Sequence, residues 1–246
     1  METNIFQLKL PFEENDFYDY TSNRCVNGDC NIKNWQQKKS TFGLLRHDIT
    51  KTLVKTENGF PKVAAYKGEF PSEIICFNSI HHNMNHNVWI HGFAEDTILE
   101  RFWQRPFYYL NKIPKDNGFI SLDFSIKLDM DDVEKRMNVY RKNAIAQIAQ
   151  NNDIKTIHTL CWGEKETFEY CFDGIECGGI YALSNIGVSN NYISRKIFKI
   201  GLIEAINILK PKGFVLYGYP MDNYYGIDTR VYSNPNLNRL HNLRFK

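Results

Sequence analysis

The sequence lacks a long hydrophobic run and lacks a charge excess of either sign. No stretch of its 246 residues approaches the run of roughly 18 apolar residues that a membrane-spanning helix needs. Its 30 basic and 28 acidic residues leave a formal net charge of +2, whereas a phosphate-binding surface normally appears as a large basic excess. We therefore expect no membrane partner. The charge balance disfavours a nucleic-acid-binding protein, which stays an alternative because a local patch of basic residues would support it.

The first residues also lack the basic segment and the apolar segment of a secretory signal peptide. We therefore expect the protein to work in the cytoplasm of the cell that makes it. The six cysteines are then expected to be reduced. Because 43% of the residues are hydrophobic and only 24% are charged, the chain has enough apolar side chains to fold around a sizeable core.

Motifs that identify a reaction are missing too. The sequence has no Gly-x-Ser-x-Gly elbow, no phosphate-binding loop and no Cys-x-x-Cys pair. Cys25 and Cys30 make at most half of a zinc site, and the spacing of the histidines from His81 to His91 fits no standard ligand pair. We expect no tightly bound metal, and the sequence indicates no cofactor.

What the sequence does contain, from about residue 70, is a series of short apolar segments typical of strands buried on both faces. Helical segments separate most of them. The predicted strands are residues 74–77, 88–93, 119–125, 156–162, 179–184 and 213–218.

Helices are expected at residues 97–113, with a break at Pro106, at 129–151 and at 194–210. Asp129 and Ser194 are plausible N-caps of the last two. One apolar stripe runs along the helix 129–151 and predicts burial of Val133, Met137 and Ile148 against the sheet. The stripe consists of Val133, Met137, Tyr140, Ala144 and Ile148.

Strands that alternate with helices predict parallel pairing through right-handed crossovers. We therefore predict a single α/β domain over residues 1–246, with a mostly parallel, barrel-like sheet that is TIM-like or an incomplete barrel. Regular βα units occupy residues 70–220, and residues 1–60 form an irregular N-terminal cover. One or two further strands are expected near residues 62–66 or near the N-terminus. An open sheet is the alternative.

In such folds, ligands bind at the carboxyl ends of the strands. This rule selects Asp123 and His91 as candidate catalytic groups, either of which could act as general acid or base. The candidate ligand-binding residues at the same strand ends are Asn78, Ser125, Trp162, Ser184, Asn185, Tyr217 and Tyr219. For each residue, a purely structural role is the alternative: Asp123 could cap a turn, and the two tyrosines could close the mouth of the barrel.

Asp123 is the most informative of these residues because a buried parallel strand is otherwise apolar. An unpaired buried carboxylate is costly, so Asp123 must face a partner, a ligand or water. Alternation places it on one side of the strand with Ser121 and Ser125, opposite Leu122 and Phe124. We predict that this polar side is the lumen of the barrel. In addition, the backbone amides of residues 184–189 and the following helix N-terminus could hold an anion.

An ordered series of short motifs between Phe119 and Pro220 resembles a known family. The series is Leu122-Asp123-Phe124-Ser125, Tyr140-Arg141, Leu160-Cys161-Trp162-Gly163, Phe172-Asp173-Gly174-Ile175, Ala182-Leu183-Ser184-Asn185-Ile186-Gly187 and Leu216-Tyr217-Gly218. The family comprises bacterial, archaeal and phage proteins and is known only as a domain of unknown function. The resemblance implies a phage or mobile-element origin and carries over no catalytic role.

Two functions follow as hypotheses. The first is an accessory protein of a phage or mobile element that binds a host or defence component, since no strong catalytic motif is present. The second is a barrel-type, hydrolase-like enzyme that acts on a nucleotide-like or sugar-like polar ligand. An open, polar pocket at the strand ends favours the enzyme, and a closed, apolar mouth favours the binding protein.

Overall fold

The computed structural model describes residues 46–80, 87–188, 191–220 and 224–233. The chain divides into two compact units, residues 1–52 and 53–246. Of the first unit, only residues 46–52 are described, and they contain the short helix α3 (His47–Thr50). The expected cover at residues 1–60 therefore lies mostly outside the described residues and stays a prediction. The second unit contains the sheet and the other helices.

The sheet of the second unit has seven strands, all of them parallel, and their order in the sheet is their order in the chain. This confirms the predicted parallel α/β fold. The strands are β1 (Glu73–Cys76), β2 (Val88–Gly92), β3 (Gly118–Leu122), β4 (Lys155–Thr159), β5 (Ile180–Ser184), β6 (Gly213–Tyr217) and β7 (Asp228–Tyr232).

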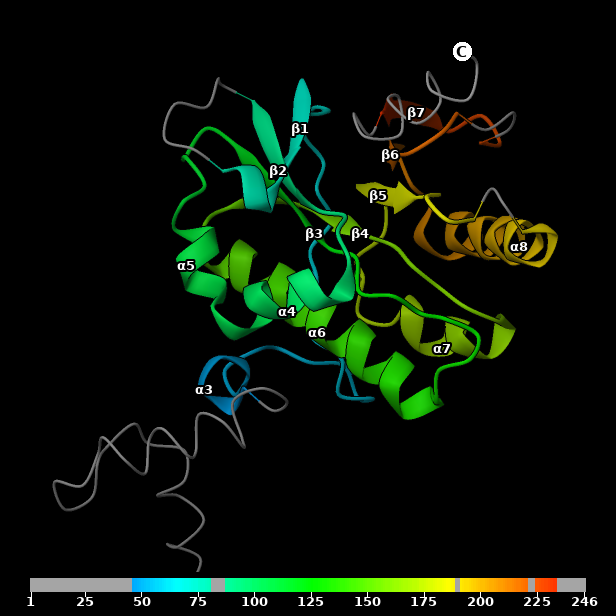
Figure 1. The fold of residues 1–246 in the computed structure, drawn as a ribbon, viewed down its shortest axis with the longest axis horizontal. Coiled ribbons are helices and arrows are strands. Elements are labelled where there is room, and N and C mark those ends of the chain that lie inside the picture. Colours follow the sequence, from blue (N-terminus) through cyan, green and yellow to red (C-terminus); the bar gives the residue numbers. More distant parts are fainter. Residues whose placement is uncertain (1–45, 81–86, 189–190, 221–223, 234–246) are drawn as a thin grey trace, which may run out of the picture. The chain divides into compact units, whose positions relative to one another are not determined.

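The sheet curls into a half-barrel, which confirms the incomplete-barrel alternative (Figure 1). The curl brings β2 opposite β6, so that Phe93 stacks on Tyr217 with ring centroids 4.8 Å apart. In the described part of the chain, β1 and β7 share no backbone pairing, but the Tyr232 hydroxyl donates to the Pro71 carbonyl at 2.5 Å. Aromatic rings thus fill the concave side, and continuous hydrogen bonding between β1 and β7 does not close the sheet.

The prediction of a further strand near residues 62–66 was wrong, and its alternative near the N-terminus lies outside the described residues. The strand that the sequence pattern missed is β7, after β6, and residues 62–66 make only isolated bridges, between Val63 and Ile175 and between Tyr66 and Ile180. β7 escaped notice because it is an edge strand with exposed and polar side chains, so it has no continuous apolar run.

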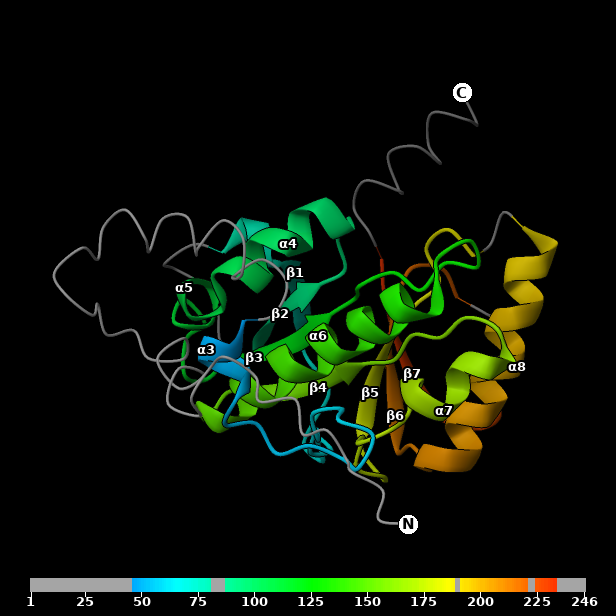
Figure 2. The same cartoon turned by 90° about the horizontal axis from the view of Figure 1, so that it is seen from below.

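The helices of this unit cover one face of the sheet, and the concave face carries none of them (Figures 1 and 2). Among the described residues, no helix is both long and apolar enough to cross a membrane. The elements are η2 (Phe77–Ser79), α4 (Asp96–Gln104), α5 (Pro106–Leu110), α6 (Asp132–Asn151), η3 (Lys165–Thr167), α7 (Phe168–Cys171) and α8 (Tyr192–Leu209). Pro106 breaks the predicted helix 97–113 into α4 and α5, as expected.

α6 begins later than predicted and buries a different face. Its N-cap is Asp131, in a capping box with Glu134, and not Asp129. Ile148 is buried as expected, but Met137 is only half-buried and Val133 is 78% exposed. The stripe prediction failed because the buried face includes polar side chains, such as Lys135, Asn138 and Lys142, that hydropathy assigns to solvent.

α8, in contrast, begins earlier than predicted, at Tyr192 and not at Ser194. Its N-cap is Asn191, whose Oδ1 accepts hydrogen bonds from the amides of Ile193 at 2.8 Å and Ser194 at 3.4 Å. Asparagine is among the best N-cap residues because its side chain satisfies amides that have no partner within the helix.

We expect Asn191→Ala to lower the free energy of unfolding by about 1 kcal/mol, the usual value of an N-cap side chain. Ser194→Ala, three residues further into the helix, is the matched control and should leave stability nearly unchanged. Urea melts of both variants and the parent make the comparison. Equal losses in the two variants would contradict the assignment of Asn191 as the cap.

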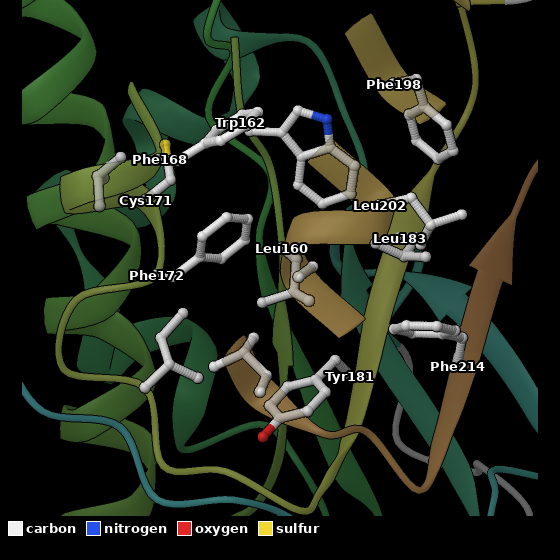
Figure 3. Packing of buried hydrophobic residues seen from close by; sticks show 14 of the residues in the cluster. Leu160, Trp162, Phe168, Cys171, Phe172, Tyr181, Leu183, Phe198, Leu202 and Phe214 are labelled. Atoms are coloured by element: carbon white, nitrogen blue, oxygen red, sulfur yellow. The ribbon is translucent and has the colours of Figure 1, made fainter. Parts of the chain in front are cut away.

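Two apolar clusters hold the unit together, one on each face of the sheet. The cluster on the helical face contains Leu160, Trp162 and Phe198, and Figure 3 shows Trp162 beside Phe198, with Phe172 on its other side. The Trp162 ring centroid lies 5.3 Å from that of Phe198 and 5.9 Å from that of Phe172. The cluster on the concave face includes Trp89, Phe93, Ile120, Ile157, Val215 and Tyr217.

Candidate pocket at the carboxyl ends of β3, β4 and β5

A cavity of about 510 Å³ lies at the carboxyl ends of β3, β4 and β5, and residues of α8 form part of its wall. This volume falls in the range typical of small-molecule sites, and the location is the one that parallel α/β folds use for ligands. The residues that matter most for its chemistry are Asp123, Ser125, Cys161, Trp162, Ser184 and Phe198.

The pocket opens where the sheet has little regular pairing. β4 and β5 share only two register pairs, His158 with Tyr181 and Thr159 with Ala182, whereas β5 and β6 share five. Beyond Leu160, whose amide still donates to Ala182, the chain leaves β4 and turns toward η3. The strand ends therefore separate, and α8 and the segment after β3 form the walls of the gap.

Asp123 follows β3 directly, and the prediction that it faces the lumen was wrong. Ile120 belongs to the concave cluster, so the residues that alternate with it face the helices. Phe119 stacks on Phe102 of α4 with centroids 5.3 Å apart, and Asp123 is electrostatically coupled to Lys142 of α6. The lumen is filled with aromatic rings, so the apolar side of β3 faces the lumen. The polar side of β3 faces α6 and the pocket.

The Asp123 carboxyl group opens onto the pocket without a partner. Its backbone amide donates to the Gly92 carbonyl at 3.1 Å, but among the described residues its side chain makes no hydrogen bond or ion pair. Burial raises the pKa of this carboxyl group, Lys142 lowers it and Asp96 raises it, and together they bring the pKa to about 7. Asp123 thus changes its protonation state near neutral pH, as a general acid or base must.

Lys142 lies under the pocket and is completely buried. Its ammonium donates to Cys161 Sγ at 2.9 Å, and Cys161 itself lines the pocket. Burial raises the pKa of the Cys161 thiol, so this group is protonated at neutral pH and is not an activated nucleophile. Asp123 is therefore the titrating group of the site.

His158 adds a second polar layer behind Lys142. Its Nδ1 lies 3.1 Å from the Ser121 hydroxyl, and burial together with the Lys142 charge holds its pKa well below the usual range. The Ser121 hydroxyl also accepts from the Thr159 amide at 2.8 Å. Ser121 and His158 thus join β3 to β4 and keep the strand ends in place beneath Asp123.

Two of the predicted serines line the pocket as well. Asp96, the first residue of α4, accepts from the Ser125 amide at 3.0 Å and from its hydroxyl at 3.2 Å, which fixes the chain just after Asp123. Ser184 ends β5, and its hydroxyl accepts a weak bond from the Ile186 amide at 3.4 Å. Of the predicted anion loop, residues 184 and 186–188 contribute to the wall, while 189 and 190 lie outside the described residues.

His91 is absent from this pocket and lies on the concave face. It is 3% exposed, its ring centroid is 4.7 Å from that of Tyr217, and its Nδ1 accepts from the Phe93 amide at 3.1 Å. Burial lowers the pKa of His91 to about 3. The structure therefore does not bring the two candidate catalytic residues together.

His91 should make the protein acid-sensitive. Because its folded-state pKa lies below its unfolded-state value, its contribution to stability is complete above pH 6.5 and is lost as pH falls toward 3. At pH 5 the loss is about 2 kcal/mol. We expect His91→Gln, which keeps a hydrogen-bond acceptor, to lose less stability than the parent between pH 7 and pH 5 in urea melts. Identical losses in both proteins would contradict this.

Three other candidates, Asn185, Tyr219 and Asn78, lie outside the lining of the pocket. Asn185 Nδ2 donates to the Tyr219 carbonyl at 2.6 Å and its Oδ1 accepts from the Tyr219 amide at 2.9 Å, which ties the segment after β5 to the segment after β6. A side chain at Gly218, where φ is +136°, would collide with Asn185 Oδ1. Asn78 is exposed in η2, at the end of β1.

Sequence reasoning missed Lys142, Cys161 and Asp96 as parts of this site. Cys161 follows β4 directly, and the strand-end rule selects it as readily as Trp162. Asp96 could have been found as an acidic residue in the first turn of a helix that follows a strand end. Lys142 carries no signal, because a lysine in a helix is normally solvated.

Metal binding finds no support in the part of the chain that is described, where no group of three or more potential ligands converges. Cys25, Cys30 and the histidines from His81 to His86 lie outside the described residues. Cys76, Cys161, Cys171 and Cys177 are free thiols.

Comparison with known proteins finds similarity to proteins of two mycobacteriophages. It is 31% identical over 129 residues to the Gene 1 protein of Mycobacterium phage L5, covering 52% of this chain and 56% of that protein. It is 30% identical over 194 residues to the Gene 1 protein of Mycobacterium phage D29, covering 75% of this chain and 68% of that protein. No solved structure matches. The model of the family described as Domain of unknown function (DUF4417) matches residues 54–232, which contain the whole sheet and the pocket, so the chain belongs to this family.

Proposed function

We propose that this protein binds a small polar ligand in the pocket at the ends of β3, β4 and β5, and that Asp123 exchanges a proton with it. The observation that carries the proposal is a carboxyl group at the wall of a cavity of about 510 Å³, for which the described part of the chain provides no hydrogen-bonding partner. Natural proteins rarely leave a polar group unpaired at such a position unless water or a ligand pairs with it.

The reaction that this geometry supports is general acid–base catalysis of a hydrolase-like type. Because its pKa is about 7, Asp123 is present in both the protonated and the ionised form near neutral pH. It can therefore act as general acid or as general base without a second catalytic carboxylate. Ser184 is a candidate for orienting the ligand, because it lines the pocket and its hydroxyl hydrogen is not used by any described partner. The cavity has room for a ligand of the size of a sugar or a nucleoside.

The test compares the parent with Asp123→Asn and with Asp129→Asn, which removes an exposed carboxylate outside the pocket. Each protein is incubated with a small-molecule extract of the host bacterium and washed, and the retained compounds are identified by mass spectrometry. A compound kept by the parent and Asp129→Asn but lost by Asp123→Asn supports the proposal. Equal retention by all three proteins, or no retained compound, contradicts it.

The second candidate function is binding of a host or defence protein in the cytoplasm of the infected cell. The observation that favours it is the outer face of α8, where Ile193, Ile200 and Ile203 are 57%, 46% and 42% exposed. These side chains share one side of the helix, opposite the buried Leu202 and Ala205. Contiguous exposed apolar side chains on a folded domain often mark a protein-binding surface.

This candidate is tested with Ile200→Lys and Ile203→Lys, which should leave the fold intact because both side chains are exposed. The parent and each variant are used to capture proteins from a lysate of the host bacterium, with Lys199→Glu on the same helix as a charge control. A specific host protein captured by the parent and the control, but not by the isoleucine variants, supports the second candidate. The same captured proteins in every sample would exclude this face as the binding surface.

A further inference from the structure

The polar end of the pocket has an uneven distribution of charge. The carboxyl group of Asp123 lines this end, and a second carboxyl group, that of Asp96, lies next to it, held by the amide and hydroxyl of Ser125. The buried cation is Lys142, which contacts Cys161 Sγ. Asp123 therefore lies near one buried cation, Lys142, and one other carboxyl group, Asp96, and among the described residues its own carboxyl group pairs with neither.

The other titratable and charged groups near Asp123 do not correct this imbalance. The Cys161 thiol and His158 are neutral, because burial raises the pKa of the thiol and lowers that of the imidazole. Arg141 of α6 lies over the Phe124 ring at 4.0 Å and pairs with Glu100. Lys127 lines the pocket, but its side chain is exposed at the rim. Asp123 therefore has no cationic partner among the described residues. A proton neutralises its carboxyl group when no ligand is bound.

The opposite wall of the pocket is apolar. It is formed by Leu160, Trp162, Val188, Ile197 and Phe198. Trp162 and Phe198 contribute ring surfaces whose centroids lie 5.3 Å apart. A ligand that fills both ends of the pocket needs one cationic or proton-donating head and a body that prefers apolar contacts.

We propose that the ligand carries a protonated amine on an apolar body, with Asp123 as the counter-ion of the amine and the Trp162–Phe198 wall around the body. This inference rests on the proposed function and narrows its ligand to the class of amines. A protonated amine replaces the proton on Asp123, so binding releases a proton and becomes tighter as pH rises through 7.

The experiment uses three probes of nearly equal shape: 2-phenylethylamine, 2-phenylethanol and 3-phenylpropionate. Their affinities for the full-length protein are measured by ligand-detected NMR at pH 6 and pH 8, where the amine stays protonated. We expect the amine to bind roughly tenfold more tightly than the alcohol at pH 8, and the carboxylate to bind most weakly. The preference for the amine should be smaller at pH 6.

Asp123→Asn should abolish the difference between the amine and the alcohol, whereas Asp129→Asn should preserve it. If the alcohol binds the parent as tightly as the amine does, or if the carboxylate binds best, the amine inference is wrong while the ligand pocket stands. If none of the three probes binds at millimolar concentration, the inference and the proposed pocket both fail. Amine binding that is unchanged in Asp123→Asn would remove Asp123 as the counter-ion.

Discussion

Asp123→Asn is expected to raise the free energy of unfolding by about 2–4 kcal/mol at pH 8 while abolishing ligand binding in the pocket. Most substitutions of a half-buried residue destabilise, so the direction of this effect is diagnostic. Asparagine keeps the shape of the side chain and resembles the protonated acid, the form that the folded protein prefers. A substitution that raises stability but removes function is typical of a group that the active protein keeps in a state unfavourable for folding.

The sign follows from the pKa. In the folded protein the pKa of Asp123 is about 7, whereas in the unfolded chain it is near the ordinary value of 3.8 for an aspartate. Between these values the folded state holds a proton that the unfolded state has lost. The contribution of Asp123 to stability is therefore complete below pH 3.8, falls as pH rises, and is fully lost above pH 7. The asparagine variant has no such loss.

Urea melts of the parent and of Asp123→Asn at pH 5, 6, 7 and 8 measure the effect as a difference, so that other titrating groups, including His91 and His158, cancel. The stability advantage of the variant should grow from pH 5 to pH 7 and then level off. Asp129→Asn, an exposed site, should show no pH-dependent difference. A variant that is less stable than the parent at every pH would identify Asp123 as a structural acid and would remove it from the site.

The strand–helix alternation was readable from the sequence because strands buried on both faces are continuous apolar runs. The same logic failed wherever burial and polarity coincide. α6 buries Lys135, Asn138 and Lys142 against partners from distant segments, among them Glu164, the Ser125 carbonyl and Cys161. Such pairs are invisible to a periodicity argument, so the predicted face was displaced toward Val133.

The candidate site was predictable in part for the same reason. Asp123, Ser125, Trp162 and Ser184 were selected because the ends of parallel strands meet at one edge of the sheet, and all of them line the cavity. The rule could not distinguish the two faces of the curled sheet. It therefore grouped His91 and Tyr217, on the concave face, with Asp123, on the helical face. The sheet itself separates these residues, because they lie on its opposite faces.

Tyr217 provides a direct test of the curvature of the sheet, because it joins β6 to β2 across the concave face. Its ring stacks on Phe93 at 4.8 Å with planes 7° apart and lies 4.7 Å from the ring of His91. The side chain is only 7% exposed, and it belongs to a cluster that includes Trp89, Ile120 and Val215. Tyr217 therefore contributes to closing the mouth of the half-barrel, and it does not line the pocket at β3–β5.

We expect Tyr217→Ala to lower the free energy of unfolding by about 3–5 kcal/mol, as for other large aromatic residues in a core. Tyr192→Ala, at a position that is 72% exposed, is the control and should change stability by less than about 0.5 kcal/mol. Urea melts at pH 8, where His91 and His158 are neutral in both the folded and the unfolded state, give both values. A double-mutant cycle with Phe93→Leu isolates the stacking pair, with an expected coupling of about 1 kcal/mol. If Tyr217→Ala were as stable as the parent but lost ligand binding, Tyr217 would be a ligand-stacking residue and the concave face would contain the site.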